Sequence, residues 1–483
     1  MMTPTTPSPS SASVWLYDIA LGVARLFRRY GLLLALVPFF FPQLVPGVSL
    51  DIVRFVSGLI AFIPLTTLIA SATEELAELL GQFIGGLLNV VFSNASDLAL
   101  TGMLLATAAG AGVSQARRGE MIEIVLYYSV GLILCHILLF PGLATFLGSL
   151  RHGRMRFDRE QAVSYTHLLG TSLAILLLPS LAYKFASGVG SLQSAALLLL
   201  TRANLTLLSD ITAVLLFVIY LLFVGSVVFQ FDFSFERRAQ NRRQRAARRR
   251  AAASDGDDTA IRQLDDAMPD TQALFAEEHA AAEARLYAAS AGAVGMSGEP
   301  RAARLEQKRQ KRQERDERRA VPSRPLRGFI ALLVLALATA VLVVVAQSVA
   351  IGVAHGILSD LHLNPLFAGL IVFPLVVNLV EAYGAVGAAW NNRMEITFAV
   401  ASGSAISWVL LGVPVLMLVS HLVGLGALPL LFGFFLVASL GIAFYLFFIS
   451  TASGETTWIE GLQMILFFAA VAVVAGVSSV VAQ

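Results

Sequence analysis

Long apolar runs separated by short polar connections make up most of the chain. A membrane-spanning helix needs roughly 20 apolar residues, and lipid offers no hydrogen-bond partner to the backbone, so only helices or a closed barrel can cross it. The runs are long enough to favour helices. The pattern predicts eleven spans, six before and five after a charged stretch, over residues 31–46, 52–73, 83–112, 119–150, 162–183, 207–231, 327–352, 358–390, 394–423, 426–450 and 457–481.

These runs divide the chain into five predicted parts. They are a cytoplasmic N-terminal tail (1–30), an N-terminal transmembrane helix (31–50), a first transmembrane repeat (51–231), a charged cytoplasmic linker (232–326) and a second transmembrane repeat (327–483). The first run is short and contains Pro38 and Pro42, and proline interrupts a helix. It could therefore form a re-entrant or peripheral element instead of a span.

The composition supports a membrane protein and argues against a chain of soluble domains. Hydrophobic residues make up 57% and charged residues 14% of the 483 residues, and the mean hydropathy is +0.75. Residues 236–327 contain 21 of the 34 Lys and Arg residues and 15 of the 32 Asp and Glu residues. That content favours a solvated, partly helical linker. The single cysteine, Cys135, cannot form an intrachain disulfide.

The basic segments predict which side of the membrane each loop occupies. Loops rich in Lys and Arg lie on the cytoplasmic side, and three segments are of this kind: Arg25–Arg29, Arg151–Arg159 and the linker. All three agree if the N-terminus is cytoplasmic, which puts the C-terminus on the far side. The linker then acts as a tether, and its basic clusters could also bind anionic lipid headgroups. No nucleic-acid partner is expected, because no nucleic-acid-binding motif accompanies the charge.

Two acidic residues, Asp97 and Glu381, lie inside apolar runs, where a charged side chain is costly and suggests a function. Both belong to one repeated pattern. A shift of 284 positions superposes Phe83 on Phe367, Gly85 on Gly369, Asn94 on Asn378 and Asp97 on Glu381. Because the two segments form the third and the eighth span, they cross the membrane in opposite directions. The predicted fold class is an all-α integral membrane protein with two inverted-topology five-helix repeats plus an N-terminal helix.

The two acids have the chemistry of a cation site. Two carboxylates that meet across the repeat interface, with Asn, Ser and backbone oxygens, form a hard oxygen cage that a divalent cation would neutralise. Without the cation, two such carboxylates repel one another and take up protons. The helix after each acid adds a polar cluster, Ser129–His136 in the first repeat and Ala401–Ser407 in the second. This pattern predicts competition of cation and proton at Asp97 and Glu381. The alternative is an acid pair that only holds helices together.

The residues around these acids resemble a known family. The first repeat reads Thr-Glu-Glu-Leu-Ala over 73–77 and Gly-Gly-Leu-Leu-Asn-Val-Val-Phe-Ser-Asn-Ala-Ser-Asp over 85–97. The second reads Pro374-x-x-x-Asn378-x-x-Glu381, followed by Asn-Arg-Met-Glu over 392–395 and by Gly403-Ser404. These motifs resemble the cation/proton exchangers (Ca²⁺/H⁺ antiporters) of the calcium/cation antiporter superfamily. The resemblance extends over about 50–160 and 330–480, and therefore over both halves.

The resemblance implies a secondary transporter and not an enzyme, with eleven spans, alternating access and no cofactor. It would exchange Ca²⁺ or another cation for protons. By this resemblance Asp97 and Glu381 are the central ligands of the metal ion and also take up the protons. The secondary ligands are Asn94, Asn378, Ser404 and Ser407. The family is expected in the vacuolar membrane of fungi and plants and in the plasma membrane of bacteria.

The chain departs from the family pattern at several of these positions. Asp97 replaces Glu, Ser93 replaces Gly, Cys135 and His136 replace a Ser-Asn pair, Val377 replaces Gly and Ser407 replaces Gln. His136 could handle protons near its titration range, act as a softer metal ligand, or pack as a neutral side chain between helices. The departures leave open exchange of a monovalent cation or a transition metal, and a non-transporting membrane scaffold.

Three acidic residues, Glu74, Glu75 and Glu78, lie at the expected cytoplasmic end of the second span. They could attract cations toward the site, or they could simply form a solvated helix end. No Gly-x-x-x-x-Gly-Lys-Ser/Thr pattern occurs in the chain, which disfavours an ATP-driven pump.

Overall fold

The computed structural model describes residues 36–45, 48–80, 92–188, 204–225 and 324–477. The chain divides into two units, Met1–Leu221 with Pro325–Gln483, and Leu222–Arg324. The predicted N-terminal tail and nearly all of the predicted linker lie outside the described residues. Apart from Leu222–Gly225 and Arg324, the helical residues discussed below belong to the first unit.

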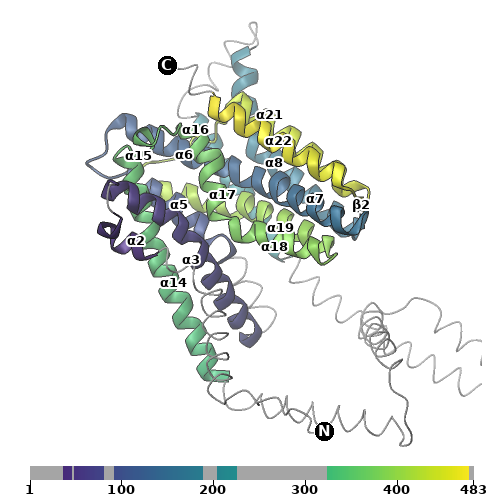
Figure 1. Cartoon of the computed structure of the whole chain (residues 1–483). Helices are drawn as coiled ribbons and strands as arrows, with labels where there is room; N and C mark the ends of the chain where they lie inside the picture. The colour runs from purple at the N-terminus through teal and green to yellow at the C-terminus, as the bar shows by residue number, and fades with distance from the viewer. Residues whose placement is uncertain (1–35, 46–47, 81–91, 189–203, 226–323, 478–483) are drawn as a thin grey trace, which may run out of the picture. The chain divides into compact units, whose positions relative to one another are not determined.

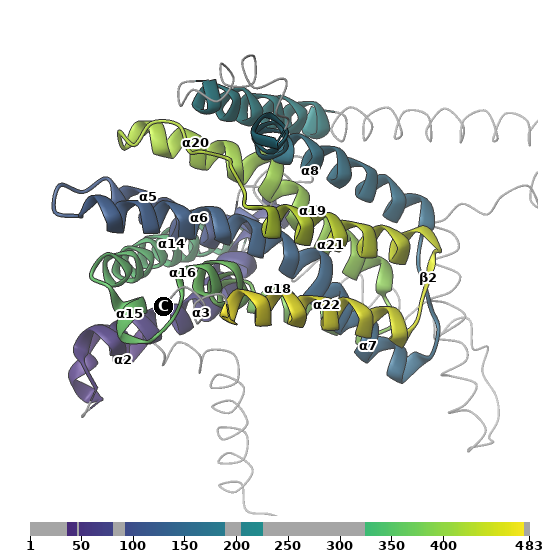
Figure 2. The ribbon, with the colours of Figure 1, turned by 90° about the horizontal axis from the view of Figure 1, so that it is seen from above.

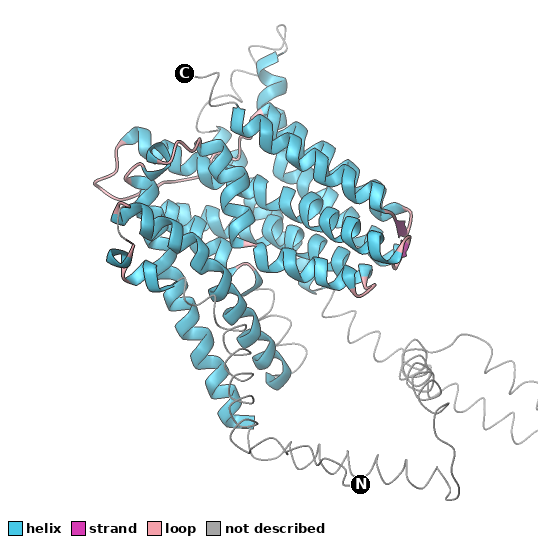
Figure 3. Cartoon of the chain, in the orientation of Figure 1, coloured by secondary structure: helices cyan, strands magenta, loops and turns pink. Residues whose placement is uncertain are grey.

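The first repeat is mostly helical in its described part (Figures 1 and 3). A short α2 and a 3-10 turn precede it. Its elements are α2 (Leu36–Phe40), η2 (Pro42–Leu44), α3 (Leu50–Leu80), α5 (Ala95–Ala108), α6 (Gln115–Leu134), the π-helical η3 (Cys135–Leu139), α7 (Phe140–His152), β1 (Met155–Arg156), α8 (Arg159–Gly188) and an unlabelled helix, Asn204–Gly225.

The second repeat follows the same order of helices. Its elements are α14 (Arg324–Ala354), α15 (Ile357–Asp360), α16 (Pro365–Phe367), the π-helical η4 (Ala368–Val372), α17 (Phe373–Val377), α18 (Leu379–Trp390), α19 (Met394–Ser407), the π-helical η5 (Trp408–Gly412), α20 (Val413–Leu422), α21 (Phe434–Ala452), β2 (Glu455–Thr456) and α22 (Trp458–Val477). β1 and β2 pair antiparallel and join the α7–α8 loop to the α21–α22 loop (Figure 2).

The prediction of a helical multi-pass membrane fold is confirmed. Eight helices in the described residues are long and apolar enough to cross a membrane, and a bent pair, Pro365–Val377 with Leu379–Trp390, makes nine. This number does not reach the predicted eleven. The run 31–46 contains only the short α2 and η2 in its described part, and the run 83–112 contains the 14-residue α5, with 81–91 outside the described residues.

Proline explains the π-helical segments of the described chain. Each of the three is followed by one residue and then by Pro141, Pro374 or Pro414. Proline has no N–H, and its ring collides with the carbonyl four residues earlier, so the helix widens by a turn with i→i−5 bonds. A shift of 273 positions superposes the segment before Pro141 on the one before Pro414. The helices after the two acids are therefore also repeated.

Asn94 and Asn378 have nearly the same backbone conformation, as the sequence repeat predicts. Asn94 precedes α5 with φ −101° and ψ 15°, and Asn378 precedes α18 with φ −104° and ψ 17°. At Asn378 the span bends by 58°. Asp97 and Glu381 each fall in the first turn of the helix that follows, where the helix dipole favours a negative charge.

Contacts between helix ends place the corresponding helices in opposite directions. On one side, Arg151 at the end of α7 lies over Trp390 at the end of α18, beside the paired strands. On the other side, Arg117 at the start of α6 lies against Gly356, just after α14. α6–α7 thus runs toward the first side, whereas α19–α20, which starts after Trp390, runs away from it. This arrangement confirms the inverted repeats.

The same contacts show which other helix ends share a side. α14 ends beside Arg117, so its start lies on the opposite side, with Arg151 and the strands. Leu79 near the end of α3 contacts Gly328 near that start. The side that carries the segment Arg151–Arg159 is therefore the side from which α14 begins, directly after the basic linker.

Candidate ion-binding site

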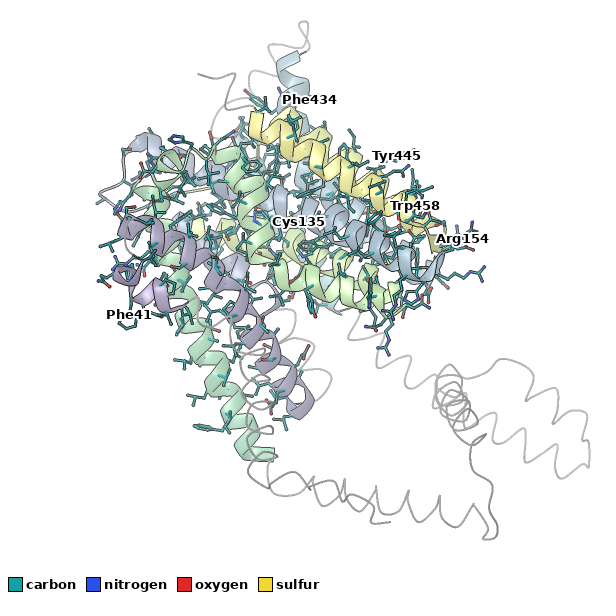
Figure 4. The ribbon with its side chains drawn as sticks, viewed as in Figure 1. Phe41, Cys135, Arg154, Phe434, Tyr445 and Trp458 are labelled. Carbon is teal, nitrogen blue, oxygen red and sulfur yellow. The ribbon has the colours of Figure 1, made fainter. Side chains whose placement is uncertain are left out.

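Two glycines let the repeats approach closely at the centre of the helices. A Cβ atom on Gly131 of α6 would overlap the carbonyl of Leu370, and one on Gly369 would collide with the carbonyl of Ile124. α6 of the first repeat therefore crosses η4 of the second at backbone contact. The crossing places the side chains of α6 and η3 beside the broken helix of the other repeat. Figure 4 shows Cys135 among the helices in the interior, well away from Arg154 at their ends.

Asp97 is the most deeply buried acid of the site, with an exposed fraction of 1%. Its Oδ1 accepts hydrogen bonds from the hydroxyl of Tyr128 at 2.5 Å and from the amide of Asn378 at 2.8 Å. Its Oδ2 is buried and has no hydrogen-bond partner among the described residues. One carboxylate oxygen is thus held by the protein, and the other is available to a ligand.

Glu381 receives its hydrogen bonds at one oxygen. Oε2 accepts from the hydroxyl of Ser404 at 2.9 Å and lies 2.7 Å from the Nε2 of His136. The Glu381 side chain is 20% exposed, in contrast to that of Asp97.

His136 connects the two repeats. Its Nδ1 lies 2.8 Å from the carbonyl oxygen of Leu132, and because a carbonyl only accepts, Nδ1 carries a hydrogen. The hydrogen between Nε2 and Glu381 must then belong either to an imidazolium facing a carboxylate or to a neutral carboxyl group facing a neutral imidazole. The pair therefore holds one proton in either form.

A third bond also crosses the repeat interface. The amide of Asn94 donates to the hydroxyl of Ser407 at 2.7 Å. The structure thus joins the residues singled out in the sequence into three groups, namely Asp97 with Asn378, Glu381 with Ser404 and His136, and Asn94 with Ser407. Each group includes a bond between the two repeats.

Tyr128 belongs to the site but was not singled out in the sequence. It is fully buried, bonds Asp97, and packs edge-on against Trp408 of the second repeat with 5.9 Å between ring centroids. Its signal in the sequence was weak, because a tyrosine in an apolar helix is usually a core residue.

Two serines of the predicted polar clusters do not bond the acids. Ser129 and Ser402 bond the carbonyls of Val125 and Phe398 within their own helices.

The acids expected to attract cations lie apart from this cluster. Glu74 and Glu75 are exposed near the end of α3, and the side chain of Glu78 lies outside the described part. No group of three or more His, Cys, Asp or Glu side chains has a metal-binding arrangement among the described residues. The predicted ligand set includes amide and hydroxyl oxygens beside the two carboxylates.

The chain is similar in sequence to several known proteins. Residues 330–477 match the family described as "Sodium/calcium exchanger protein". The chain is 25% identical over 432 residues to the vacuolar calcium ion transporter of Cryptococcus neoformans var. grubii, covering 88% of this chain and 68% of that protein. It is also 25% identical over 424 residues to a Ca²⁺/H⁺ antiporter of Synechocystis sp., covering 86% and 89% of the two chains.

The fold is similar to that of a solved membrane protein as well. The structure of native YfkE matches with a TM-score of 0.57 and 19% identity, covering 92% of this chain and 97% of that one. The chain is similar in sequence to several calcium ion transporters and Ca²⁺/H⁺ antiporters over most of its length. The resemblance in the sequence motifs is thereby confirmed, and the family match includes Asn378, Glu381 and Ser404 of the second repeat.

Proposed function

We propose that this relative of the cation/proton exchangers is a secondary active antiporter that exchanges Ca²⁺ for protons at Asp97 and Glu381. The observation that carries the proposal is the placement of both acids at the repeat interface, where each is bonded by a residue of the other repeat. Asn378 bonds Asp97, and His136 bonds Glu381. Charged groups at this depth are costly unless they serve transport or are paired.

Competition between cation and proton couples the two movements. Ca²⁺ prefers several oxygen ligands, which Asp97 and Glu381 supply with Asn94, Asn378, Ser404 and Ser407. Protons on the same carboxylates weaken their attraction for the cation. The His136–Glu381 pair holds a proton in either of its forms, so loading of a cation at Glu381 requires that this hydrogen bond be replaced. Exchange follows if the site reorients with either ion bound but not when both are absent.

Alternating access would move the two repeats relative to each other around the acids. The bonds from Asn94 to Ser407 and from Asn378 to Asp97 cross that interface. They are the contacts that we expect to exchange partners during the cycle. Glu74 and Glu75 would raise the cation concentration at the cytoplasmic end of α3.

The membrane and its lipids are part of the proposal. Names of the eukaryotic relatives, such as the vacuolar calcium ion transporter of Cryptococcus neoformans, support a vacuolar membrane for a eukaryotic source. Bacterial antiporters among the relatives support a plasma membrane for a bacterial source. Contact of the basic linker with anionic headgroups would add about 1 kcal/mol for each cation near the surface.

The decisive experiment is ⁴⁵Ca²⁺ uptake by proteoliposomes under an imposed pH gradient. We expect uptake that collapses with the gradient and that is lost in Asp97→Asn and Glu381→Gln. Glu123→Gln is the matched control, because Glu123 lies on α6 but is exposed and bonds only Tyr127 in the described chain. Uptake that survives both site substitutions would contradict the proposal.

The alternative of a non-transporting scaffold predicts the opposite effect of these substitutions. If the chain only organises other proteins, then Asp97→Asn and Glu381→Gln leave cellular ion tolerance unchanged, and deletion of residues 236–327 abolishes the function. The antiporter proposal expects cells with either site substitution to be sensitive to external Ca²⁺.

A further inference from the structure

We infer that a hollow where α18 meets α19 binds an anionic phospholipid, with the guanidinium of Arg393 holding the phosphate of its headgroup. The two helices lie side by side (Figure 1). The hollow has a volume of about 500 Å³ and is lined by Gly387, Ala388, Asn391, Arg393 and Ile396. That volume lies within the range of pockets that take small molecules. None of the lining residues belongs to the ion site, so the inference does not depend on the proposed transport function.

The turn between α18 and α19 fixes the position of Arg393. Asn392 has φ +58°, a left-handed conformation that asparagine adopts more readily than most residues. The N–H of Asn392 donates to the carbonyl of Ala389, and the N–H of Arg393 donates to the carbonyl of Ala388, both at 3.0 Å. These two bonds form a Schellman motif, which ends a helix and folds the chain back against its last turn. Arg393 is therefore held beside Ala388, on the wall of the hollow.

The charge of Arg393 is available to an anionic ligand. Its side chain is exposed and makes no ion pair in the part of the chain that the structure describes, although Glu395 lies only two residues further along. A guanidinium can donate two parallel N–H groups to the oxygens of one phosphate. The hollow thus offers a cationic group with the geometry that phosphate prefers.

The hollow lies at a helix end with the features of a membrane–water interface. Trp390, the last residue of α18, is 46% exposed, and tryptophan is enriched where the membrane meets water. Arg151 lies over its ring, 4.7 Å from the centroid, and brings a second guanidinium to this end. We expect this side to be cytoplasmic, where the leaflet carries anionic lipids. Basic pockets between membrane helices on that side bind anionic headgroups in other proteins.

The apolar part of the surface favours a lipid over a free phosphate ion. Gly384 and Gly387 lie three residues apart on α18, and a Cβ atom on either would meet no heavy atom within 4 Å. Ile396, on the α19 side of the hollow, is 41% exposed. The glycerol and the first carbons of the acyl chains can cover such apolar surface, whereas a small inorganic anion cannot. The chemistry of both parts together is that of a phospholipid.

Photocrosslinking in vesicles tests the inference with the full-length protein. Ile396→p-benzoylphenylalanine places a photoreactive group in the hollow, and the lipid adducts are measured by mass spectrometry. The vesicles contain four parts phosphatidylcholine to one part phosphatidylglycerol, with identical acyl chains. We expect phosphatidylglycerol to be enriched among the adducts about fivefold or more over its share of the vesicle lipid, because one cation near the surface favours an anionic lipid by about this factor.

A second labelling position is the matched control for general exposure to lipid. Ile459 is 50% exposed at the start of α22, directly after β2, and does not line the hollow. Ile459→p-benzoylphenylalanine should give adducts in proportion to the vesicle composition. The linker is the same in both proteins, so attraction of anionic lipid by its basic clusters affects both positions alike.

Three substitutions in the Ile396-labelled protein separate the charge of Arg393 from general surface charge. Arg393→Gln should reduce the enrichment to the level at Ile459. Arg156→Gln makes the same change of charge on β1, at a side chain that is 80% exposed and outside the hollow, and should leave the enrichment unchanged. Gly387→Leu keeps every charge but fills the hollow from a position with open space around it, so it should also remove the enrichment.

Each possible result supports or overturns the inference. Adducts at Ile396 that only match the vesicle composition, or an enrichment that survives Arg393→Gln, would show that the hollow does not hold the headgroup. An equal loss in Arg156→Gln would assign the effect to general surface charge. Glycerophosphoglycerol, the headgroup without acyl chains, should not displace the lipid, and displacement at equal concentration would identify a site for free anions instead. No ion transport is measured, so failure here would leave the antiporter proposal standing, and absence of Ca²⁺ uptake would leave this inference standing.

Discussion

The amide of Asn378 donates a 2.8 Å hydrogen bond to Oδ1 of Asp97, although the two residues come from opposite repeats. Its counterpart Asn94 also reaches across the interface, but it bonds the hydroxyl of Ser407 and not Glu381. The repeat symmetry therefore holds in the backbone of the two asparagines and is broken in their partners. This asymmetry makes the two acids chemically different, because Asp97 is held by Tyr128 and an amide, and Glu381 by a histidine and a hydroxyl.

Removal of the Asn378 amide should destabilise the interface. In Asn378→Ala, the buried Oδ1 of Asp97 loses one of its two hydrogen-bond donors. This loss should lower the free energy of unfolding by about 1–3 kcal/mol. We expect a lower melting temperature in detergent and reduced Ca²⁺ uptake. Asn391→Ala is the control, because Asn391 is exposed and its amide bonds the Gly387 carbonyl of its own helix. An equal loss of stability in both variants would argue against a special role for the bond to Asp97.

Tyr128→Phe should shift the pH dependence of Ca²⁺ binding upward. The variant keeps the ring that packs on Trp408 but removes the hydroxyl that stabilises the ionised Asp97. Protons then compete with Ca²⁺ more effectively at a given pH, so half-maximal ⁴⁵Ca²⁺ binding should move to higher pH by about half a unit to one unit. The neighbouring Tyr127→Phe, which loses a bond to the exposed Glu123, should bind with an unaltered profile. Half-maximal binding at a lower pH in Tyr128→Phe would contradict the interpretation that the Tyr128 hydroxyl stabilises ionised Asp97.

The organisation of the fold follows from patterns that the sequence displays directly. Runs of apolar residues predict spans because the membrane requires them. The repeat of Asn94 and Asp97 at Asn378 and Glu381 predicts inverted halves, and the matching backbone angles at the two asparagines agree with it. The number of spans was harder to obtain, because the proline-containing run near Phe39 forms only short helical turns in the described part.

Contacts of the side chains within the site could not be predicted from helical periodicity. Each π-helical segment adds a residue to a turn, which rotates the following positions by about 100° relative to an ideal helix. Ser129, in the regular part of α6, bonds the carbonyl of its own helix, whereas His136, within such a segment, reaches Glu381. Tyr128 was missed because its hydroxyl function depends on the distant Asp97, and the local sequence resembles that of a packed core helix.

Gly131→Ala should disrupt the crossing of the repeats. The added Cβ would meet the carbonyl and Cα of Leu370, and backbone atoms cannot move aside as a flexible side chain can. Overpacking of this kind lowers the free energy of unfolding by about 1–3 kcal/mol or more. We therefore expect a large drop in melting temperature and loss of uptake. Gly119→Ala on the same helix has open space around it and should stabilise the protein by up to about 1 kcal/mol. Similar melting temperatures for the two variants would show that the close crossing does not form.

Cysteine labelling can test the predicted sidedness of the α6–α7 span without any transport assay. Ala111, in the loop between α5 and α6, and Arg154, beside β1, are exposed at helix ends that the contacts place on opposite sides. With the protein in the plasma membrane of intact bacterial cells, a membrane-impermeant maleimide should label Ala111→Cys directly and Arg154→Cys only after permeabilisation. The native Cys135 is buried, so unaltered protein gives the background. Labelling of both positions from the outside would contradict the prediction that Gln115–His152 crosses the membrane once.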